Sequence, residues 1–392
     1  MSQHESLGDL EPQARVIAFY LPQFHPMKEN DEWWEPGFTE WTQVTRARPL
    51  FRGHQQPQLP SELGFYDLRV PETREQQASL ARECGIEGFC YWHYWLGNGR
   101  RLLERPFEDV LSSGQPDFPF CLAWANHDWS GTAFGAGRRL LAKQLYPGFE
   151  DYLAHFKFLA RAFADSRYIR VNGKPLFYIY RPHEIPDCKK VMEFFREQAE
   201  KVGHKGLYLV GETASGGKAE KYGLDAGHLS RHRQISLDDK REPSTVNRAF
   251  KKLKRLTGVG IASLADDPIQ RYDYGEAMKV VIKDRYLANE YPSIVSNWDT
   301  TPRFGRDAVV FENATPEAFR NHLKEALSKV DERPFENRLL FLRAWNEWAE
   351  GNYMEPDVAY GRQRLEVLKE ELMTRRAVVS KMGESLSSES SS

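Results

Sequence analysis

Residues 72–95 read ETREQQASLARECGIEGFCYWHYW and contain one complete helix-to-strand unit. Residues 72–84 have the spacing of an amphipathic helix, in which apolar or small side chains recur on one face. Gly85 then interrupts that pattern, and residues 86–91 form a short apolar run that is rich in β-forming side chains. The stretch therefore predicts a helix that is followed at once by a buried strand.

The same alternation of helix and strand patterns extends along most of the chain. Apolar runs that predict strands are found at 16–20, 86–91, 118–124, 175–180, 207–210, 293–296 and 339–344. Amphipathic patterns that predict helices lie between them at 102–112, 149–166, 188–202, 274–288 and 315–330, with a closing helix from residue 360. One further strand, the sixth in order, is expected within residues 222–236.

Strands that alternate with helices form a parallel sheet, because each parallel connection has to cross over the sheet. About eight such units in one chain favour a closed barrel over an open sheet. No Gly-x-Gly-x-x-Gly or Walker A sequence follows any of the strands, which argues against a nucleotide-binding open sheet. The sequence thus predicts an α/β protein, a single-domain (β/α)8 TIM barrel with loop insertions.

The predicted barrel is the catalytic domain and covers residues 15–376. Residues 1–14 are expected to be a flexible N-terminus, and residues 377–392 a disordered tail, because this Ser-rich end has little apolar surface to bury. Residues 237–272 are a polar, basic insertion. Its most basic part, 240–255, is expected to be a solvated helix face, with weak contact to an anionic membrane surface as the sharper alternative.

Charge and hydropathy narrow the classes of function. The net charge is −2 over 392 residues, so the chain has no overall field that would attract nucleic acid. The first residues have no signal-peptide pattern, and no run approaches the roughly 18 apolar residues of a membrane span. We therefore expect a cytoplasmic protein without a transmembrane segment. No heptad pattern or apolar stripe predicts an oligomeric state.

Aromatic residues make up 13% of the chain, including 10 Trp and 17 Tyr. Such side chains suit stacking on sugar rings, although large cores use them too. The cysteines have neither the spacing of a zinc site nor that of a disulfide framework, so we expect reduced thiols in the core, no metal and no cofactor. They are Cys84, Cys90, Cys121 and Cys188.

Polar and aromatic side chains follow most of the predicted strands. The active site of such a barrel lies at the C-terminal ends of its strands, so these side chains should meet at one rim. A lone Trp or His at a strand end is more often a packing residue, but six rim segments share the bias. Glu40 and Trp41, after the first strand, form either a lid or part of the top layer. The residues expected to contact substrate are Tyr20, Gln23, His25, Trp92, His93, Trp124, Asn126, Asp128, Glu212, Asn297, Trp298 and Asn346.

The last predicted strand runs into WNEWAEG at 345–351, which contains two glutamates three residues apart. Cleavage of a glycosidic bond needs one group to protonate the leaving oxygen and another to act beside the anomeric carbon. Many solvated helices contain Glu-x-x-Glu, but this pair follows a buried strand and ends at Gly351. Glu347 and Glu350 are therefore the predicted catalytic pair. Burial beside Trp side chains is expected to raise the pKa of one of them.

Five segments spread over residues 16–358 resemble one known family. They read FYLPQFH (19–25), EWWEPGFTEW (32–41), GFCYWHYW (88–95), NGKPLFYIYRP (172–182) and WNEWAEGNYMEPD (345–357). Together they resemble the WbsX-type, glycoside hydrolase family 99-like proteins, which are commonly encoded with bacterial polysaccharide and O-antigen biosynthesis genes. The resemblance implies an oligosaccharide or polysaccharide substrate.

Family 99 contains retaining, endo-acting α-mannosidases with a proposed mechanism through a 1,2-anhydro sugar. By resemblance, Glu347 is the base that deprotonates the sugar 2-hydroxyl. Glu350 is the acid that protonates the leaving oxygen and later activates water, and no metal or nucleotide is needed. Ala349 stands where those hydrolases typically have His, so the resemblance leaves the mannoside specificity open. The expected function is cleavage or remodelling of a glycosidic bond in a bacterial polysaccharide or O-antigen glycan.

Three other classes of function fit part of the sequence. A glycosyltransferase of O-antigen, lipopolysaccharide or exopolysaccharide assembly is the main alternative. The chain lacks the Asp-x-Asp motif that would bind a metal and a nucleotide in such an enzyme. A metal-dependent hydrolase would use His25, His93, His127 and Asp128, but these residues have no clustered ligand spacing. A glycan-binding module without activity would not need an intact glutamate pair.

Overall fold

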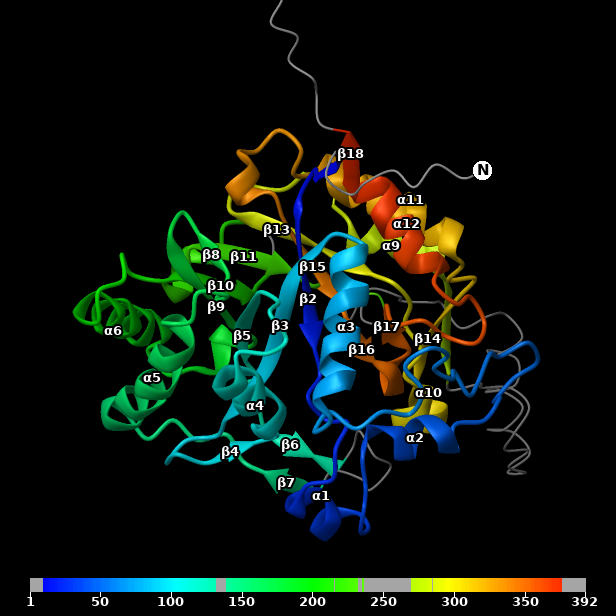
Figure 1. Ribbon diagram of the computed structural model, residues 1–392, viewed down its shortest axis with the longest axis horizontal. Coiled ribbons are helices and arrows are strands. Elements are labelled where there is room, and N and C mark those ends of the chain that lie inside the picture. The colour runs from blue at the N-terminus through cyan, green and yellow to red at the C-terminus, as the bar shows by residue number, and fades with distance from the viewer. Residues whose placement is uncertain are drawn as a thin grey trace, which may run out of the picture.

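Within the residues that the computed structural model describes, eight parallel strands close into a barrel (Figure 1). The described residues are 10–131, 139–214, 216–231, 235, 269–283 and 285–375. The barrel strands are β2 (Arg15–Tyr20), β3 (Ile86–Trp95), β5 (Phe120–Trp124), β9 (Lys174–Ile179), β10 (Tyr208–Glu212), β11 (Ala226–Leu229), β13 (Glu290–Val295) and β15 (Leu339–Arg343). They pair in chain order, and β15 pairs with β2 to complete the circle. The predicted TIM barrel is confirmed, and β11 is the sixth strand expected within residues 222–236.

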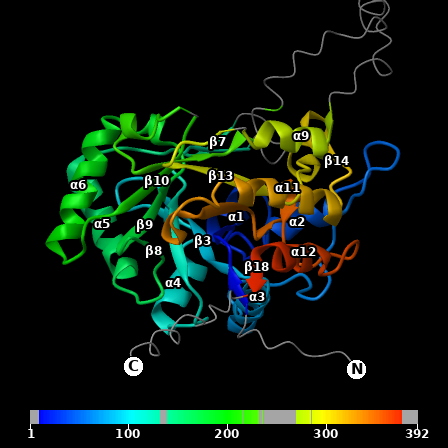
Figure 2. The same ribbon diagram turned by 90° about the horizontal axis from the view of Figure 1, so that it is seen from above.

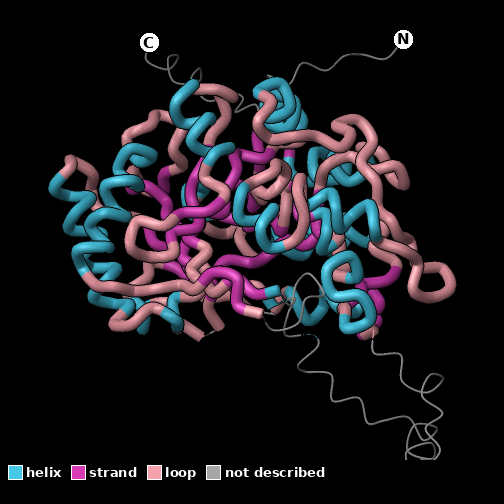
Figure 3. Tube along the Cα trace, turned by 90° about the horizontal axis from the view of Figure 1, so that it is seen from below, coloured by secondary structure: helices cyan, strands magenta, loops and turns pink. Residues whose placement is uncertain are grey.

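Helices surround the barrel, as Figure 2 shows from above and Figure 3 by secondary structure. The longer ones are α3 (Pro71–Glu83), α4 (Arg105–Ser113), α5 (Phe149–Phe163), α6 (Cys188–Lys201), α9 (Tyr274–Val281), α11 (Pro316–Ser328) and α12 (Gln363–Leu372). Local chemistry sets their ends. The Thr315 hydroxyl caps α11 by accepting a hydrogen bond from the Ala318 amide. The helix predicted at 274–288 is shorter and ends at Val281, because the backbone becomes extended at Ile282, with φ of −88° and ψ of 130°.

Strand β3 continues beyond its predicted end and pairs antiparallel with β4 (Arg101–Leu102). Residues expected in a loop therefore belong to a strand, in which successive side chains point to opposite faces. Trp92 and Tyr94 line a pocket at the mouth of the barrel. His93 and Trp95 instead pack against His155 of α5. This extra strand length decides which of the predicted rim residues can reach a ligand.

Aromatic side chains fill the inside of the barrel. Phe19 stacks on Trp92 with ring centroids 4.7 Å apart, and Tyr178 meets Phe19 edge-on at 5.0 Å. The next residue along β2, Tyr20, faces outward and donates a hydrogen bond of 2.6 Å to Gln77 of α3. The barrel is therefore a packed core and not a channel. Four buried cysteines are free thiols, as expected: Cys84, Cys90, Cys121 and Cys188.

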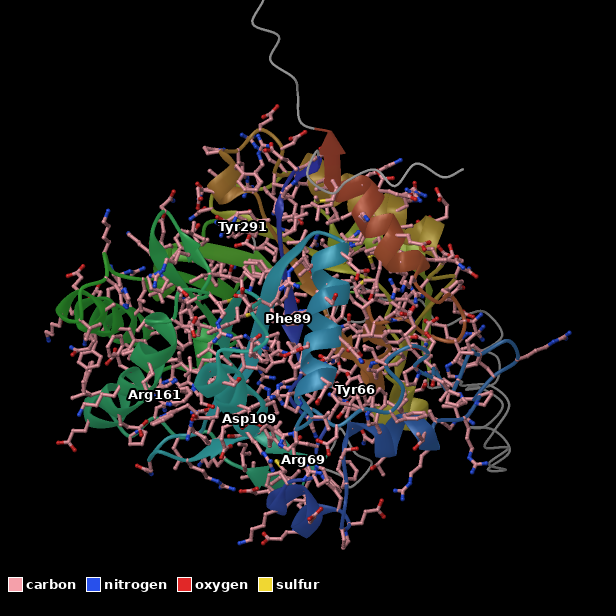
Figure 4. The ribbon with its side chains drawn as sticks, viewed as in Figure 1. Tyr66, Arg69, Phe89, Asp109, Arg161 and Tyr291 are labelled. Carbon is pink, nitrogen blue, oxygen red and sulfur yellow. The ribbon has the colours of Figure 1, made fainter. Side chains whose placement is uncertain are left out.

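The two ends of the barrel carry different elements. Where the strands begin, β1 (Leu10–Pro12) pairs antiparallel with β18 (Met373–Arg375), at the top of Figure 1. The opposite end carries elements from the loops that follow the strands. These are α1 (Lys28–Trp33), α2 (Glu40–Arg46), β6 (Trp129–Ser130), β7 (Leu140–Ala142) and α10 (Thr301–Phe304). Figure 4 shows Tyr291 toward the first end and Tyr66 toward the second.

Short elements complete the fold. The strands are β8 (Arg170–Val171), β12 (Gln270–Asp273), β14 (Val309–Glu312), β16 (Asn346–Glu347) and β17 (Asn352–Tyr353). The 3-10 helices are η3 (Pro182–Glu184), η4 (Glu220–Tyr222), η6 (Gly305–Asp307), η7 (Phe335–Asn337) and η8 (Trp348–Glu350). Strands β12 and β14 form a separate parallel pair beside the barrel.

Several predicted segments fall outside the described residues. They are the N-terminus up to residue 9, the tail 377–392, and the insertion 237–272 as far as residue 268, with its basic stretch 240–255. The last residues of the insertion are described and begin β12. Among the described helices, none is both long and apolar enough to cross a membrane. Contact of the basic stretch with a membrane surface stays a prediction.

Candidate active site

A pocket with a volume of about 240 Å³ opens at the C-terminal ends of the barrel strands. Its walls come from residues at or after the ends of β2, β3, β5, β9, β13 and β15, which is the rim predicted from the sequence. Phe19, Trp92 and Tyr180 contribute aromatic surface, and Glu347 and Glu350 contribute carboxyl groups. Aromatic walls with a few converging polar groups are typical of a site for a small organic ligand or a sugar.

A tight hairpin after β15 brings the two glutamates to this pocket. Strands β16 and β17 pair antiparallel, and η8 forms the turn between them. In a 3-10 turn, side chains three residues apart lie above one another, so Glu347 and Glu350 face the same side. Gly351 ends the turn in the left-handed conformation, with φ of 61°. The sequence WNEWAEG therefore folds so that both carboxyl groups line one cavity.

The side chain of Arg303, on α10, connects the two glutamates. Its Nη2 atom lies 2.7 Å from Oε1 of Glu347, and its Nη1 atom lies 2.8 Å from Oε1 of Glu350. A third carboxylate, that of Glu40 on α2, accepts a hydrogen bond of 3.1 Å from Nε of the same guanidinium. Glu40 has no exposed surface, so this four-residue cluster is an interior one. The structure thus brings the predicted pair together around one arginine.

Burial sets the protonation of this cluster. It raises the pKa of Glu347 to about 7, against the opposing effect of Arg303 and with a further increase from the nearby Glu350 charge. Burial also raises the pKa of Glu40. For Arg303 burial lowers the pKa, but the three carboxylates outweigh it and leave the pKa well above its ordinary value. One permanent cation therefore faces three carboxyl groups, and Glu347 exchanges a proton near neutral pH.

No sequence pattern points specifically to Arg303. It lies in the segment DTTPRFGRD at 299–307, which has no pattern that distinguishes it from a surface arginine. Its position shortly after the seventh strand was the available clue, because residues there reach the rim. Glu40 was expected to belong to a lid or to the top layer of the barrel. In the structure, Glu40 accepts hydrogen bonds from Arg303, which also contacts Glu347 and Glu350.

Asp299 is buried and contacts the turn at 347–351 from the side away from the pocket. Its backbone amide donates a hydrogen bond of 2.8 Å to the carbonyl oxygen of Glu350. Its carboxylate accepts hydrogen bonds from His54 Nε2 at 2.8 Å, Gln56 Nε2 at 2.7 Å and Thr301 Oγ1 at 2.6 Å. This network fixes the position from which Glu350 enters the pocket.

Gly351 packs directly against Asp299. A β-carbon at residue 351 would lie 2.8 Å from both the backbone nitrogen and the Cβ atom of Asp299. We expect Gly351→Ala to reduce the free energy of unfolding by about 2–4 kcal/mol, because a steric clash adds to left-handed backbone strain. Turnover should fall as well, since Glu350 must shift. Urea denaturation and kcat/KM measure the two effects.

Gly361 provides the matched control for this substitution. It also has a positive φ, 54°, but a β-carbon there would meet no atom within 4 Å. Gly361→Ala should therefore cost only the backbone strain, about 1–2 kcal/mol, and leave kcat/KM unchanged. Equal losses of stability in the two variants would show that the contact with Asp299 is unimportant.

A second buried carboxylate, that of Glu355, supports the turn at 347–351 through Trp348. Glu355 accepts hydrogen bonds from Trp348 Nε1 at 2.6 Å, from Gln77 Nε2 at 2.6 Å and from the hydroxyl of Tyr66 at 2.8 Å. Burial raises the pKa of Glu355 to about 7, against these hydrogen bonds. Trp348 lies between Glu347 and Glu350 in η8, so Glu355 anchors that helix to α3 and to the loop that carries Tyr66 (Figure 4).

An arginine also lies on the inner side of the pocket. Arg343, the last residue of β15, sits over the rings of Phe19, Trp92 and Tyr180, at 5.0, 5.7 and 5.9 Å from their centroids. Its Nη2 atom is 2.7 Å from Oε2 of Glu212. Glu212, expected to contact substrate, therefore reaches the pocket region through Arg343.

The predicted substrate-contacting residues divide into two groups. Gln23, Trp92 and Asp128 line the pocket together with the glutamate pair. His127 lines it as well, although it was named only for the metal-dependent alternative. Tyr94 and Arg181 also line the pocket and were not among the expected substrate contacts. These positions lie where the strand-end rule placed them, and their contact with a substrate stays a prediction.

Other predicted contacts are placed behind the pocket walls. Tyr20 and His93 point away from the barrel axis, because residues next to an inward-facing one face outward. Trp124 donates its indole N–H to the Trp95 carbonyl and packs on His155. These side chains support the wall from outside the cavity, which differs from the contact role expected for them.

Two amides and two rings have similar supporting positions. The Asn126 side chain bonds both the amide and the carbonyl of Arg181, and the Asn346 side chain bonds both the amide and the carbonyl of Leu21. His25 and Trp298 are buried but do not line the pocket. A third amide, that of Asn297, lines a different cavity beyond Asp299. Strand-end position alone did not separate these residues from the ones that line the pocket.

Comparisons with known proteins agree with the barrel. The family model described as "Glycosyltransferase WbsX" matches residues 16–368. Two curated relatives, each called "Uncharacterized protein WxcX" and from two strains of Xanthomonas campestris pv. campestris, are 34% identical over 363 and 365 residues. The matches cover 92% of this chain and 50% of each relative, so the chain spans half the length of these relatives.

Solved structures show the same fold at low sequence identity. A "Glycoside hydrolase-like protein" has a TM-score of 0.55 and 17% identity, and the match covers 92% of this chain and 94% of that chain. The GH99 endo-alpha-mannosidase from Bacteroides thetaiotaomicron has a TM-score of 0.50 and 14% identity, over 91% of this chain and 95% of that chain. At these identities the likeness shows the fold alone. Because the family match extends over almost the whole barrel, this chain belongs to the WbsX family.

Proposed function

We propose that this protein is a glycoside hydrolase-like enzyme that cleaves or remodels a glycosidic bond in a bacterial polysaccharide or O-antigen glycan. The observation that carries the proposal is the convergence of Glu347 and Glu350 on one aromatic-walled pocket at the mouth of the barrel. Two carboxyl groups facing one cavity are what acid–base cleavage of a glycoside requires. The solved mannosidase with the same fold, and the family to which this chain belongs, support a carbohydrate substrate.

The proposed reaction retains the configuration at the anomeric carbon. Glu347 takes the proton of the sugar 2-hydroxyl while that oxygen bonds to the anomeric carbon, and Glu350 gives a proton to the departing glycosidic oxygen. The product is a 1,2-anhydro sugar. Glu350 then takes a proton from water as the water oxygen attacks the anomeric carbon, and Glu347 returns its proton to the 2-oxygen. Both residues finish in their starting states.

The electrostatics of Glu347 fit its role as the base. A general base works best when its pKa lies near the operating pH, and the pKa of Glu347 is about 7. Arg303 bonds one oxygen, Oε1, of each glutamate. We propose that this contact orients both carboxyl groups toward the substrate. Glu40 balances the arginine from the opposite side.

A pH profile follows from the assignment of Glu347 as base. The base must be ionised, and it is ionised above its pKa, so kcat/KM should rise with pH with a midpoint of about 7. The measurement is initial-rate kinetics across the acid limb. Glu336→Gln, at a carboxylate that pairs with Arg15 where the strands begin, should keep the same midpoint. An acid limb near 4.5, the ordinary value for Glu, would contradict this role for Glu347.

A glycosyltransferase is the second candidate, favoured by the description of the family. A nucleotide-sugar donor carries a diphosphate and calls for cations that are not already neutralised. Among the described lining residues, each arginine has a carboxylate partner. These pairs are Arg181 with Glu184, Arg343 with Glu212, and Arg303 with the cluster. This pairing favours the hydrolase over the transferase.

Product analysis separates the two candidates. The purified, metal-free protein is incubated with bacterial O-antigen and with mannose- or rhamnose-rich polysaccharides, with and without nucleotide sugars. Fragments formed without nucleotide would support the hydrolase. Extension that requires a nucleotide sugar would overturn the proposal in favour of the transferase. Fragments formed from mannose-rich glycans would extend the likeness to the mannosidase in spite of Ala349.

A further inference from the structure

We infer that a second cavity, on the far side of Asp299 from the catalytic pocket, binds a neutral sugar residue. The cavity has a volume of about 540 Å³, within the range of roughly 300–1,000 Å³ found for ligand sites. The loop 51–59, the end of β14 and the segment 357–360 line it. Asp299 lines it as well, and the amide of the same residue holds the Glu350 carbonyl. The two cavities therefore share one wall.

Two buried amide oxygens in this cavity lack a hydrogen-bond donor. Oδ1 of Asn297 and Oε1 of Gln58 have no partner, although both atoms are removed from the surface and both residues line the cavity. The Asn297 side chain is well buried, with 7% of the residue exposed. A buried acceptor without a donor is costly, so such atoms call for a ligand or water that donates. Sugar hydroxyl groups are donors of this kind.

The charged groups around the cavity are already paired or hydrogen-bonded, which selects against an anionic ligand. Asp299 is held by His54, Gln56 and Thr301, as described above. The other acidic groups have cationic partners at bonding distance. These pairs are Asp357 with Arg364 at 3.0 Å and Glu312 with Arg271 at 2.8 Å. An acidic sugar or a phosphate would find no unbalanced cation among these described residues, whereas a neutral sugar would meet acceptors and donors.

Apolar surface borders the polar groups. Tyr360 and Val358 lie at the rim, and Val358 is 68% exposed, which is high for a branched apolar side chain. Sugars combine hydroxyl groups with apolar C–H faces, so they match a site that mixes amides with aromatic and aliphatic surface. The proposed function guides the choice of probe, because it assigns the protein to carbohydrate chemistry.

Binding measurements on the full chain test the second cavity separately from turnover. The probes are mannose, rhamnose and neutral oligosaccharides built from them, followed by isothermal titration calorimetry and saturation-transfer NMR. Gln58→Leu and Asn297→Leu each remove one of the two acceptors at similar volume. We expect each to weaken binding of at least one probe by about tenfold, which is the loss expected for one well-placed hydrogen bond. Gln76→Leu, an exposed amide on α3, is the matched control and should bind as the wild type does.

The probes for which the two variants lose affinity show whether the bound sugar is a separate molecule or part of one long glycan. Loss with monosaccharides indicates a separate sugar molecule, and loss with longer oligosaccharides alone indicates one glycan that reaches both cavities. Glu347→Gln should retain binding at the second cavity whether or not it abolishes turnover, so failure of the proposed function would not mimic failure of this inference. Unchanged affinity in both Gln58→Leu and Asn297→Leu, or no binding of any probe by the wild-type protein, would overturn it. Because Asn297 is buried, thermal denaturation checks that the Asn297→Leu variant is folded. Gln58→Leu, at a partly exposed residue, gives an independent answer.

Discussion

Glu347→Gln and Glu350→Gln are each expected to abolish measurable turnover while the protein stays folded. Removing one acid–base group typically costs about 10²–10⁴ in rate, and both groups are needed in the proposed reaction. Glutamine keeps the shape of the side chain, so ligand binding should be largely retained. Stability should not fall, because the cluster contains three carboxyl groups and one guanidinium, and losing one carboxylate reduces its excess negative charge. Rates, ligand titration and thermal denaturation measure the three properties.

A control at the opposite end of the barrel isolates the effect of charge at the site. Glu336 pairs with Arg15 where the strands begin, far along the barrel axis from the pocket. Glu336→Gln should leave kcat/KM unchanged. Retained activity in either pocket variant would break the catalytic assignment. Loss of activity together with loss of folding in Glu347→Gln would assign that residue a structural role instead.

Arg303→Met is expected to produce the largest change in stability. Methionine keeps much of the apolar volume but leaves Glu40, Glu347 and Glu350 without their cation. Breaking a buried ion pair by removing one partner typically costs about 3–5 kcal/mol. Arg303 is enclosed, and 11% of its side chain is exposed, so solvent screening does not cancel this cost. Denaturation by urea at neutral pH measures the change in the free energy of unfolding.

The loss of stability in Arg303→Met should depend on pH in a defined direction. Burial already raises the pKa values of Glu40 and Glu347 above that of an exposed Glu, and removal of the arginine raises them further. The folded variant then binds more protons than the unfolded chain, so its stability is highest at low pH and falls as the pH rises through the folded-state pKa values. The deficit relative to the wild type should be small near pH 5 and large near pH 8, by the same linkage.

Two comparisons make this prediction discriminating. Arg303→Lys keeps a cation and should restore most of the stability, but its single ammonium cannot bond three carboxylates in the geometry of a guanidinium, so turnover should remain reduced. Arg46→Met removes an arginine from the exposed pair with Glu35, and should cost about 1 kcal/mol or less. A deficit in Arg303→Met that does not vary with pH would contradict the charge-balance explanation.

The proposed second cavity bears on how the family description and the fold can be reconciled. The pocket has the paired carboxyl groups of a hydrolase, whereas the family is described as a glycosyltransferase. Glycoside cleavage and transfer to another sugar differ in whether water or a hydroxyl group attacks the anomeric carbon. A second cavity that holds an acceptor sugar would favour remodelling by transfer between glycans, without a nucleotide donor. The binding and product experiments described above bear on this point together.

Much of the fold was predictable because its signals are local. The helix and strand patterns of 72–95 recur along the chain, and a parallel sheet with eight such units closes in a known way. The same rule placed the site at the strand ends, and the segment WNEWAEG was recognisable as the source of two converging glutamates. The exact extent of β3 was not predictable, because its last residues are held by pairing with β4, which follows a loop.

The sequence by itself thus determined the barrel, and it predicted the end at which the pocket opens and the convergence of Glu347 and Glu350 there. Only the tertiary structure decided which neighbours act with them. Arg303 bonds Glu40 across 263 residues of sequence and Glu347 across 44, and no local pattern records such contacts. It also decided that Trp92 lines the pocket and His93 does not, since strand register assigns each side chain to a face. Local patterns encode elements, whereas the charge balance of a buried site depends on side chains that meet only when the barrel closes.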